Sequence, residues 1–419
     1  MGVKVTVVGG GSTYTPELVE GVVRRADRLP IDELALLDVD AERLDIVGGL
    51  AGRMLDRAGW SGRLLRTTSR DEALDGADFV LVQLRVGGQA ARFRDETVPP
   101  RFGAVGQETT GPGGLAKAIR TVPVILDLAE AVGHRAAAGH WIVDFTNPVG
   151  IVTQALIDGG HRALGLCNVA IGMQRWLAEW LDVAPERVAL EHVGLNHLSW
   201  VRAVFVDGVD VLPRLIAEDA DRIAEHTGLP VDYVRSVGAI PSYYVRYYES
   251  TDEVIREQLD GHTRAEDVMN IERDLLEMYR DPTLTEKPAL LGKRGGAYYS
   301  EAAVDLIASL HDGRGDVQVV DVRNDGALPD LAATAVVEVP SRIDRAGAHP
   351  LPLAPLAPKE RELVEAVKAY EMLAVEAART GDRGAALRAL VANPLARDVA
   401  DPEGLLDGLL ADRAPVAGA

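Results

Sequence analysis

A β-branched segment that runs into three glycines and then into a helix start opens this chain. Val3 to Val8 has the length and residue types of a strand buried on both faces of a sheet. Gly9, Gly10 and Gly11 follow, and Pro16 stands early in the next segment, where a helix tolerates proline. This order of strand, glycine turn and helix predicts the first unit of a parallel sheet that binds a dinucleotide.

Strand-like and helix-like segments then alternate over about the first 190 residues. This alternation is typical of a doubly wound parallel sheet of the Rossmann kind. The expected strands are 34–37, 77–84, 141–145 and 163–166, and the expected helices include 41–57 and 115–138.

The pattern changes in the second half of the chain. Residues 198–206 look like a hairpin arm, and a further strand pair is expected at 317–323 and 334–339. Helical segments are expected at about 212–226, 264–280, 297–310 and 358–379. We therefore predict a Rossmann-like domain at 1–195 and a mixed α+β domain at 196–419.

Size and charge restrict the class of protein. A chain of 419 residues is long enough for two domains. The net charge of −20 argues against nucleic acid and anionic membranes as partners, but local arginines could still hold a small anion. We expect no membrane span, because no run of eighteen apolar residues occurs. A single cysteine and an N-terminus without secretory features predict a cytoplasmic protein.

The glycine turn has the spacing Gly9-x-Gly11-x-x-Tyr14, which lacks the third glycine of the usual fingerprint. Asp38 strengthens it, because an acid at the end of the second strand binds the ribose of NAD and disfavours the phosphorylated cofactor. A plain turn followed by a capping aspartate is the alternative. We expect cofactor contacts from five residues of this region: Gly9, Gly11, Ser12, Thr13 and Asp38.

The chain has one cysteine, Cys167, and it precedes Asn168. His197 lies in the later run Gly194 to Leu198. A thiolate and an imidazole together suit a transition metal. On their own, however, the two residues are weak evidence for a metal site, because a lone cysteine is more often a buried small side chain and His197 could be a hydrogen-bonded histidine at a strand end.

Several further motifs occur in a fixed order between residue 2 and about residue 300, and together they resemble glycoside hydrolase family 4. They are Gly9 to Leu18, Arg85-Val86-Gly87-Gly88, Gln107 to Gly114, Phe145-Thr146-Asn147-Pro148, Cys167-Asn168, Gly194-Leu195-Asn196-His197 and Lys293 to Ser300. The family resembles lactate and malate dehydrogenases in fold. It hydrolyses glycosides with NAD and a divalent metal, usually Mn²⁺, and is an exception to the two-carboxylate rule for glycosidases.

The resemblance implies roles for individual residues. Cys167 and His197 would bind the metal, and Tyr244 would be the base at sugar carbon 2, with Tyr243 as the alternative. The substrate-binding residues would be Arg85 and Arg294 for a phosphate, Asn147 for sugar or nicotinamide ribose hydroxyls, Asn168 for the sugar, and Glu108 for a role not yet assigned. Because Asn168 has no proton to give at neutral pH, the acid that protonates the leaving group is left open.

Family members with Cys-Asn at this place act on 6-phospho-β-glucosides. The resemblance therefore implies hydrolysis of a phosphorylated disaccharide such as cellobiose 6-phosphate to glucose 6-phosphate, through oxidation at carbon 3, elimination, addition of water and reduction. It also implies an NAD-binding domain at 1–195, a domain for substrate, metal and oligomerisation at 196–419, and a homodimer or homotetramer. The alternatives are a member acting on an α-linked or unphosphorylated glycoside, a 2-hydroxyacid dehydrogenase, and a non-catalytic NAD-binding sensor.

Overall fold

The computed structural model describes residues 2–295 and 298–411, so Gly296 and Ala297 of the last motif lie outside the described residues. Within these residues the larger sheet has nine strands in the order β13-β12-β11-β6-β5-β4-β1-β2-β3. Six of them are parallel: β1 (Val3–Val8), β2 (Ile31–Leu37), β3 (Arg63–Thr67), β4 (Phe79–Val82), β5 (Trp141–Asp144) and β6 (Ala163–Gly165).

The spatial order 3-2-1-4-5-6 of the parallel strands is that of a doubly wound dinucleotide-binding sheet. The predicted fold class is confirmed. β3 was not predicted, because this edge strand is polar and only its last residue is buried. The strand predicted at 77–84 is shorter and spans Phe79–Val82.

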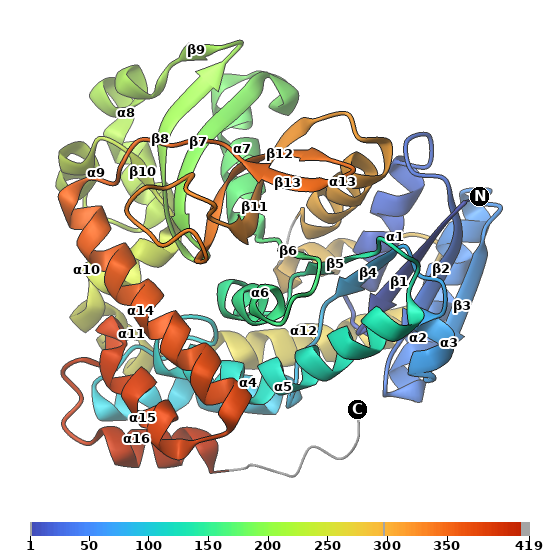
Figure 1. Cartoon of the computed structure of the whole chain (residues 1–419), viewed down its shortest axis with the longest axis horizontal. Coiled ribbons are helices and arrows are strands. Elements are labelled where there is room, and N and C mark those ends of the chain that lie inside the picture. Colours follow the sequence, from blue (N-terminus) through green and yellow to red (C-terminus); the bar gives the residue numbers. More distant parts are fainter. Residues whose placement is uncertain (1, 296–297, 412–419) are drawn as a thin grey trace.

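Helices cover both faces of the sheet (Figure 1). α1 (Thr15–Arg24) and α2 (Ala41–Arg57) contact α13 (Tyr299–Asp312) and α12 (Arg264–Tyr279), respectively. A second group consists of α4 (Gly88–Thr97), α5 (Gly111–Arg135), α6 (Val149–Asp158) and α14 (Pro358–Thr380), with α5 in contact with the other three. α5 begins four residues earlier than predicted, with Pro112 in its first turn.

The second half of the chain extends the first-half sheet. β11 (Asp316–Arg323) pairs antiparallel with β6, and β12 (Val336–Asp344) and β13 (Gly347–Pro350) follow it outward. The predicted strand pair is thereby confirmed. The division of the chain after residue 195 stays a prediction, and it falls in the turn between β7 (Val188–Leu195) and β8 (Leu198–Val206).

β7 and β8 form a second, smaller sheet with β9 (Val209–Asp210) and β10 (Ile240–Pro241). It shares an apolar core with α7 (Asn168–Leu181) and α8 (Leu212–Thr227). The remaining helices are α3 (Arg70–Leu74), α9 (Val231–Val237), α10 (Arg246–Glu249), α11 (Thr251–Asp260), α15 (Arg383–Ala392) and α16 (Pro402–Leu410). Short 3₁₀ turns occupy Pro99–Phe102, Pro185–Arg187, Tyr243–Val245, Ala289–Arg294 and Pro394–Ala396.

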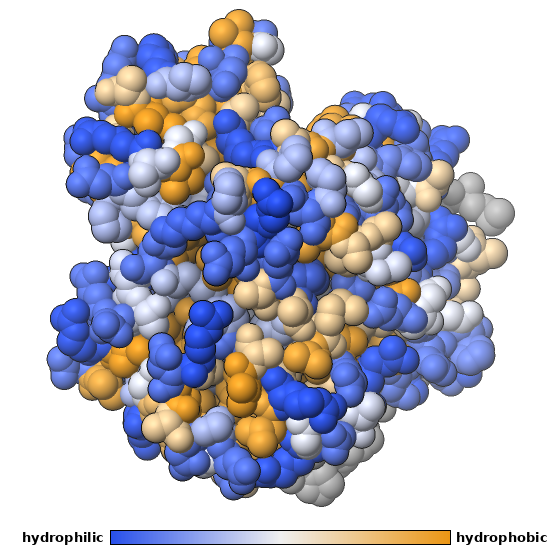
Figure 2. Space-filling view, turned by 60° about the vertical axis from the view of Figure 1, so that its left-hand side comes forward, coloured by the Kyte–Doolittle hydropathy of each residue, from blue (hydrophilic) through white to orange (hydrophobic). Residues whose placement is uncertain are grey.

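The C-terminal helices return to the first half of the chain, where α14, α15 and α16 all lie against α5 (Figure 1). Hydrophilic residues cover most of the face in Figure 2, and apolar residues appear there in scattered groups. In the described part of the chain no helix is both long and apolar enough to cross a membrane.

Candidate active site

A cavity of about 1540 Å³ opens beside the carboxyl ends of the parallel strands. It adjoins β1 and β4, between which the strand order reverses, and ligands of open α/β sheets bind at this place. Most of the predicted site residues line it: Gly9, Gly11, Ser12, Asp38, Arg85, Glu108, Asn147, Asn168, His197, Tyr244 and Arg294.

The glycine turn at the end of β1 leaves no room for side chains. Gly9 has a φ of 87°, and a Cβ atom there would lie 2.7 Å from the carbonyl oxygen of Gln83. The N–H of Gly11 donates to Oδ2 of Asp38 over 2.8 Å. The other oxygen of Asp38 accepts from the N–H of Asp40 over 3.0 Å. Asp38 therefore ties the turn to β2 and still borders the cavity.

Thr13 is the predicted cofactor residue that the structure does not bring to the cavity. Its side chain is fully buried, and its carbonyl oxygen accepts a 2.8 Å hydrogen bond from the hydroxyl of Tyr279 on α12. The start of α1 thus turns Thr13 into the protein, whereas the neighbouring Ser12 lines the cavity.

Asn147 follows β5, and its peptide bond to Pro148 is cis. The amide oxygen of Asn147 has almost no solvent contact and no hydrogen-bond partner among the described residues. A buried polar atom without a partner at the edge of a cavity is a typical ligand contact. Asn168 lines the cavity as well, from the first turn of α7.

The two predicted metal ligands differ in their access to the cavity: His197 lines it, whereas Cys167 does not. Cys167 follows β6 and is the N-cap of α7, with 4% of its surface exposed. Burial and the neighbouring Glu338 carboxylate raise the pKa of its thiol well above the ordinary value. His197 occupies the tight turn between β7 and β8 with a φ of 61°. Among the described residues, no group of three or more His, Cys, Asp and Glu side chains is arranged to hold a metal ion.

The imidazole of His197 is held on one edge and on one face. Its Nδ1 lies 2.9 Å from the hydroxyl oxygen of Thr109, and its ring stacks on the ring of Tyr244. Burial lowers the pKa of His197 to about 3, so the ring is neutral near pH 7. A neutral imidazole is the form that binds metal ions.

Tyr244 lies in a 3₁₀ turn, Tyr243–Val245, that leads into α10. Burial raises the pKa of its phenol, the nearby Cys167 and Glu108 raise it further, and the Arg92 guanidinium opposes them. The protein groups around Tyr244 therefore favour the neutral phenol.

Glu108 forms ion pairs with three cationic side chains at the cavity wall. It pairs with Arg85, with Arg92 over 3.2 Å and with Lys117 over 2.6 Å. Burial alone would raise the pKa of Glu108, but these three charges outweigh it and hold that pKa well below its usual range. Burial also lowers the pKa of Lys117 to about 8. The role that the sequence left open for Glu108 is thus electrostatic: it balances the cations around it.

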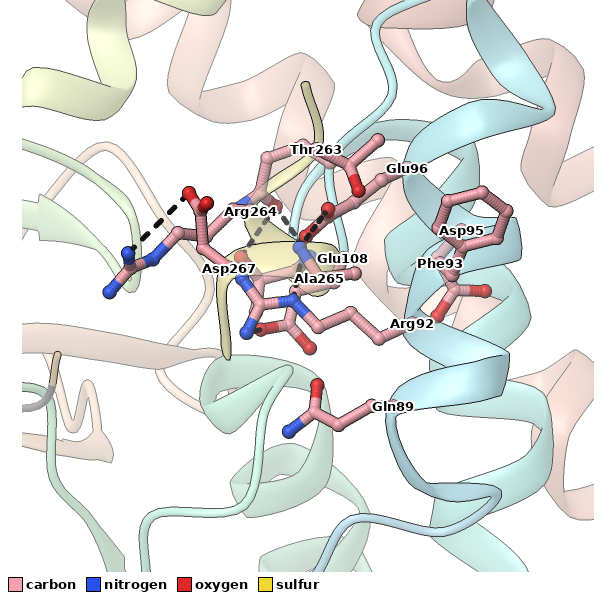
Figure 3. Close-up of polar contacts among 12 residues, drawn as sticks. Gln89, Arg92, Phe93, Asp95, Glu96, Glu108, Thr263, Arg264, Ala265 and Asp267 are labelled. Atoms are coloured by element: carbon pink, nitrogen blue, oxygen red, sulfur yellow. Dashed lines mark hydrogen bonds and ion pairs between the residues drawn. The ribbon is translucent and has the colours of Figure 1, made fainter. Parts of the chain in front are cut away.

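Figure 3 shows how Glu96, which is held by Arg92, joins α4 to the start of α12. Nε of Arg92 donates to Oε1 of Glu96 over 2.6 Å, and the other contact of Arg92 is Glu108. Oε2 of Glu96 accepts the N–H of Ala265, in the first turn of α12, over 2.8 Å. A carboxylate at a helix N-terminus is favourable, so this contact fixes α12 against the cavity.

Arg294 lines the cavity close to Tyr14 and pairs with Glu272. Glu272 Oε1 accepts from Arg294 over 2.8 Å and from Gln89 over 3.2 Å. The guanidinium carbon of Arg294 lies 5.8 Å from the ring centre of Tyr14. Arg294 therefore reaches the same cavity as Arg85 from the other half of the chain.

Sequence reasoning did not identify Arg92, Lys117 and Glu272 as members of the site. Two of them carried a usable signal. Arg92 follows the Gly87-Gly88 pair by about one helical turn, and Lys117 is a lone charge in the small and apolar segment Gly113 to Ile119. Nothing near Glu272 distinguishes it from other acids in its charged helix.

Two family models match the chain. The family 4 glycosyl hydrolase model matches residues 4–183, and the model of the C-terminal domain of that family matches residues 192–396. The chain is 42% identical to a probable 6-phospho-β-glucosidase of Bacillus subtilis, over 98% of this chain and 96% of that protein. It is 36% identical to a 6-phospho-β-glucosidase of Escherichia coli, over 96% and 93%.

Solved structures agree with these sequence matches. A 6-phospho-β-glucosidase from Thermotoga maritima, solved with manganese, NAD⁺ and glucose 6-phosphate, superposes with a TM-score of 0.92 at 34% identity over 98% of both chains. A malate dehydrogenase from Plasmodium falciparum is similar in fold only, with a TM-score of 0.55 at 14% identity over 90% of this chain and 99% of that one. The chain belongs to the family 4 glycosyl hydrolases.

Proposed function

We propose that the chain hydrolyses 6-phospho-β-glucosides to glucose 6-phosphate with NAD and a divalent metal ion, Mn²⁺. One observation carries the proposal. The glycine turn with Asp38, His197 stacked on Tyr244, and the arginines Arg85 and Arg294 all line one cavity, and Cys167 directly precedes Asn168, which lines it as well. The 6-phospho-β-glucosidase names of the Bacillus subtilis and Escherichia coli relatives support the substrate class.

The residues present fit the two groups. The backbone at Gly9 admits no side chain, and Gly9, Gly11 and Asp38 all line the cavity, as expected where a dinucleotide approaches the glycine turn. Cys167 and His197 offer a sulfur and a nitrogen donor, a set that suits transition metals. Since they are only two donors, sugar hydroxyls would complete the coordination. When bound, NAD supplies a reversible hydride acceptor and the metal ion a Lewis acid.

Tyr244 is proposed as the base that takes the hydrogen from sugar carbon 2. Its phenol is uncharged in the protein alone, because burial raises its pKa. A metal ion held by Cys167 and His197 would place a positive charge near Tyr244, because His197 stacks on its ring, and this charge would favour the phenolate. Tyr244 would thus become a base only in the loaded site.

Arg85 and Arg294 are proposed to bind the sugar phosphate. Each is ion-paired with a carboxylate, Glu108 or Glu272, which keeps the planar guanidinium oriented in the cavity. Asn147 and Asn168 are proposed to orient the sugar through their amides. A cytoplasmic location and a homodimeric or homotetrameric assembly remain predictions from the sequence.

One assay tests the function. The protein is incubated with NAD, Mn²⁺ and a reductant and is supplied with 4-nitrophenyl 6-phospho-β-glucoside, with the unphosphorylated β-glucoside and with the 6-phospho-α-glucoside. We expect turnover of the first alone and loss of turnover with a chelator. Equal rates on the phosphorylated and unphosphorylated β-glucosides would refute the phosphate assignment. Preference for the α-anomer would refute the linkage.

A further inference from the structure

Two side chains that the proposed reaction does not use, Gln107 and Thr109, form a hydrogen-bonded line that ends on His197. The hydroxyl of Thr109 lies 2.6 Å from Oε1 of Gln107 and 2.9 Å from Nδ1 of His197. Oε1 of Gln107 also lies 2.5 Å from the backbone N of Thr109 and 2.8 Å from that of Thr110. Gln107, Thr109 and Thr110 belong to the short segment before α5, whereas His197 belongs to the turn between β7 and β8.

The direction of each hydrogen bond follows from the donors available. Oε1 of Gln107 faces two backbone N–H groups, so this end of the amide is the carbonyl oxygen, which only accepts. The single proton of the Thr109 hydroxyl is then used in donating to Gln107. The Thr109 oxygen can contact His197 only as an acceptor, and Nδ1 must carry the proton.

We propose that Gln107 and Thr109 are positioning residues, which hold His197 as the Nδ1–H tautomer and leave Nε2 as the nitrogen that binds the metal. A neutral imidazole has one protonated nitrogen and one free lone pair, and the partner of the first nitrogen selects which is which. The inference rests on the proposed function, which makes His197 a metal ligand, and it specifies which nitrogen of His197 binds the metal.

Burial and stacking make this selection effective. His197 and Thr109 are 2% and 6% exposed, so bulk water hardly competes for Nδ1. The parallel ring of Tyr244 fixes the plane of the imidazole. A half-turn of the imidazole about its bond to Cβ would move Nδ1 away from the Thr109 oxygen and leave a buried N–H without an acceptor. One tautomer and one ring orientation are therefore stabilised together.

A purely structural role for the same residues predicts something different. Gln107 also accepts from the backbone just before α5, so it could serve only to shape that turn. Thr110 is the matched control, because it is a buried threonine in the same turn, 7% exposed. Its hydroxyl lies 3.4 Å from the same Gln107 oxygen, whereas Nδ1 of His197 bonds to Thr109.

The experiment compares wild type with Thr109→Val, Thr109→Ser, Thr110→Val and Gln107→Leu. The tautomer of His197 is read from the side-chain ¹⁵N shifts of histidine-labelled, metal-free protein, with a His197→Gln sample for assignment. Mn²⁺ affinity is measured from the electron paramagnetic resonance signal of the free ion, with NAD and glucose 6-phosphate present. Circular dichroism melts establish which variants are folded.

We expect Thr109→Val to lose the pure Nδ1–H tautomer and to bind Mn²⁺ about 10- to 100-fold more weakly, the usual cost of removing an outer-shell partner. Thr109→Ser and Thr110→Val should keep the wild-type tautomer and affinity. Gln107→Leu should free the Thr109 proton to donate to Nδ1, so that the Nε2–H form appears. This variant repeats the test should Thr109→Val fail to fold.

A folded Thr109→Val protein with the wild-type tautomer and Mn²⁺ affinity overturns the inference. So does a Thr110→Val protein that loses both, because the turn and not the hydroxyl would then be responsible. Absence of Mn²⁺ binding in wild type would instead refute the proposed metal site. The nitrogen shifts would still decide the tautomer in that case, so the two failures are distinguishable.

Discussion

The imidazole of His197 and the phenol ring of Tyr244 lie parallel, with their planes 5° apart and their centroids 3.8 Å apart. Tyr243 meets Tyr244 edge-on at 6.0 Å, and 48% of its surface is exposed. The parallel contact places the Tyr244 ring directly against the face of the candidate metal ligand. This geometry supports Tyr244 over Tyr243 as the base.

Tyr244→Phe keeps the ring that stacks on His197 and removes only the hydroxyl. We expect kcat to fall by about 10²- to 10⁴-fold, the usual contribution of a general base, with Mn²⁺ affinity unchanged. Exchange of the carbon 2 hydrogen with solvent deuterium, followed by NMR, should stop as well. Tyr243→Phe is the matched control and should keep exchange; persistent exchange in Tyr244→Phe would assign the base elsewhere.

Arg294→Lys tests recognition of the phosphate. Lysine keeps the charge but loses the planar fork that matches a phosphate and that donates to Glu272 through Nε and NH2. Loss of one charge-assisted hydrogen bond costs about 1.5 to 3 kcal/mol, so KM should rise roughly 10- to 100-fold while kcat changes less. Arg235→Lys, a change at a half-exposed arginine on α9, should leave steady-state kinetics unchanged. An unaltered KM in Arg294→Lys would remove Arg294 from the phosphate site.

The sequence predicted the parallel sheet well because strands buried on both faces read as apolar runs, as Val3–Val8 and Phe79–Val82 do. It could not predict that β11 pairs with β6. That contact joins strands about 150 residues apart, and nothing in the sequence of either strand indicates which strand it pairs with. Site residues such as Gly9 and Arg294 could be predicted because they belong to recognisable motifs, and both line the cavity. The pairing of Glu108 with Arg92 and Lys117 follows only from how α4 and α5 pack.

Glu108→Gln should destabilise the fold. The change leaves Arg85, Arg92 and Lys117 without their shared carboxylate, and loss of one partner from a buried ionic cluster costs about 3 to 5 kcal/mol. Folding lowers the pKa of Glu108, so its contribution is present above the unfolded value of 4.5 and is lost as the pH falls through the lower folded pKa. Urea unfolding at several pH values should show a difference that is constant above pH 5 and shrinks in acid. A constant difference at all pH values would exclude an electrostatic origin.

A row of acidic side chains crosses the larger sheet from β5 to β12. Asp144 on β5 pairs in register with Gly165 on β6, Gly165 with Asp321 on β11, and Asp321 with Glu338 on β12. Residues paired in this way share one face of a sheet. A Cβ atom on Gly165 would lie 2.7 Å from Cβ of Asp321, so the glycine provides the room for this carboxylate. Both oxygens of Asp321 are buried and lack hydrogen-bond partners within the described residues.

Asp321→Asn should stabilise the protein at neutral pH. Burial, Glu338 and Glu371 raise the pKa of Asp321 well above 3.8, while Lys368 opposes them. A carboxyl with a raised folded pKa stabilises the fold most below its unfolded pKa, and this stability is lost as the pH rises through the folded pKa. Asparagine removes the charge and can donate to a neighbouring carboxylate, which should add about 1 kcal/mol or more above that window.

Asp316→Asn on the same strand is the opposite control, because Ser309, Arg314 and Arg28 lower the pKa of Asp316. Between pH 5 and 8 the melting temperature of Asp321→Asn should rise with pH relative to wild type, whereas that of Asp316→Asn should lie below wild type by a constant amount. A lower melting temperature for Asp321→Asn than for wild type at pH 8 would mean that the ionised Asp321 carboxylate is stabilised in the fold.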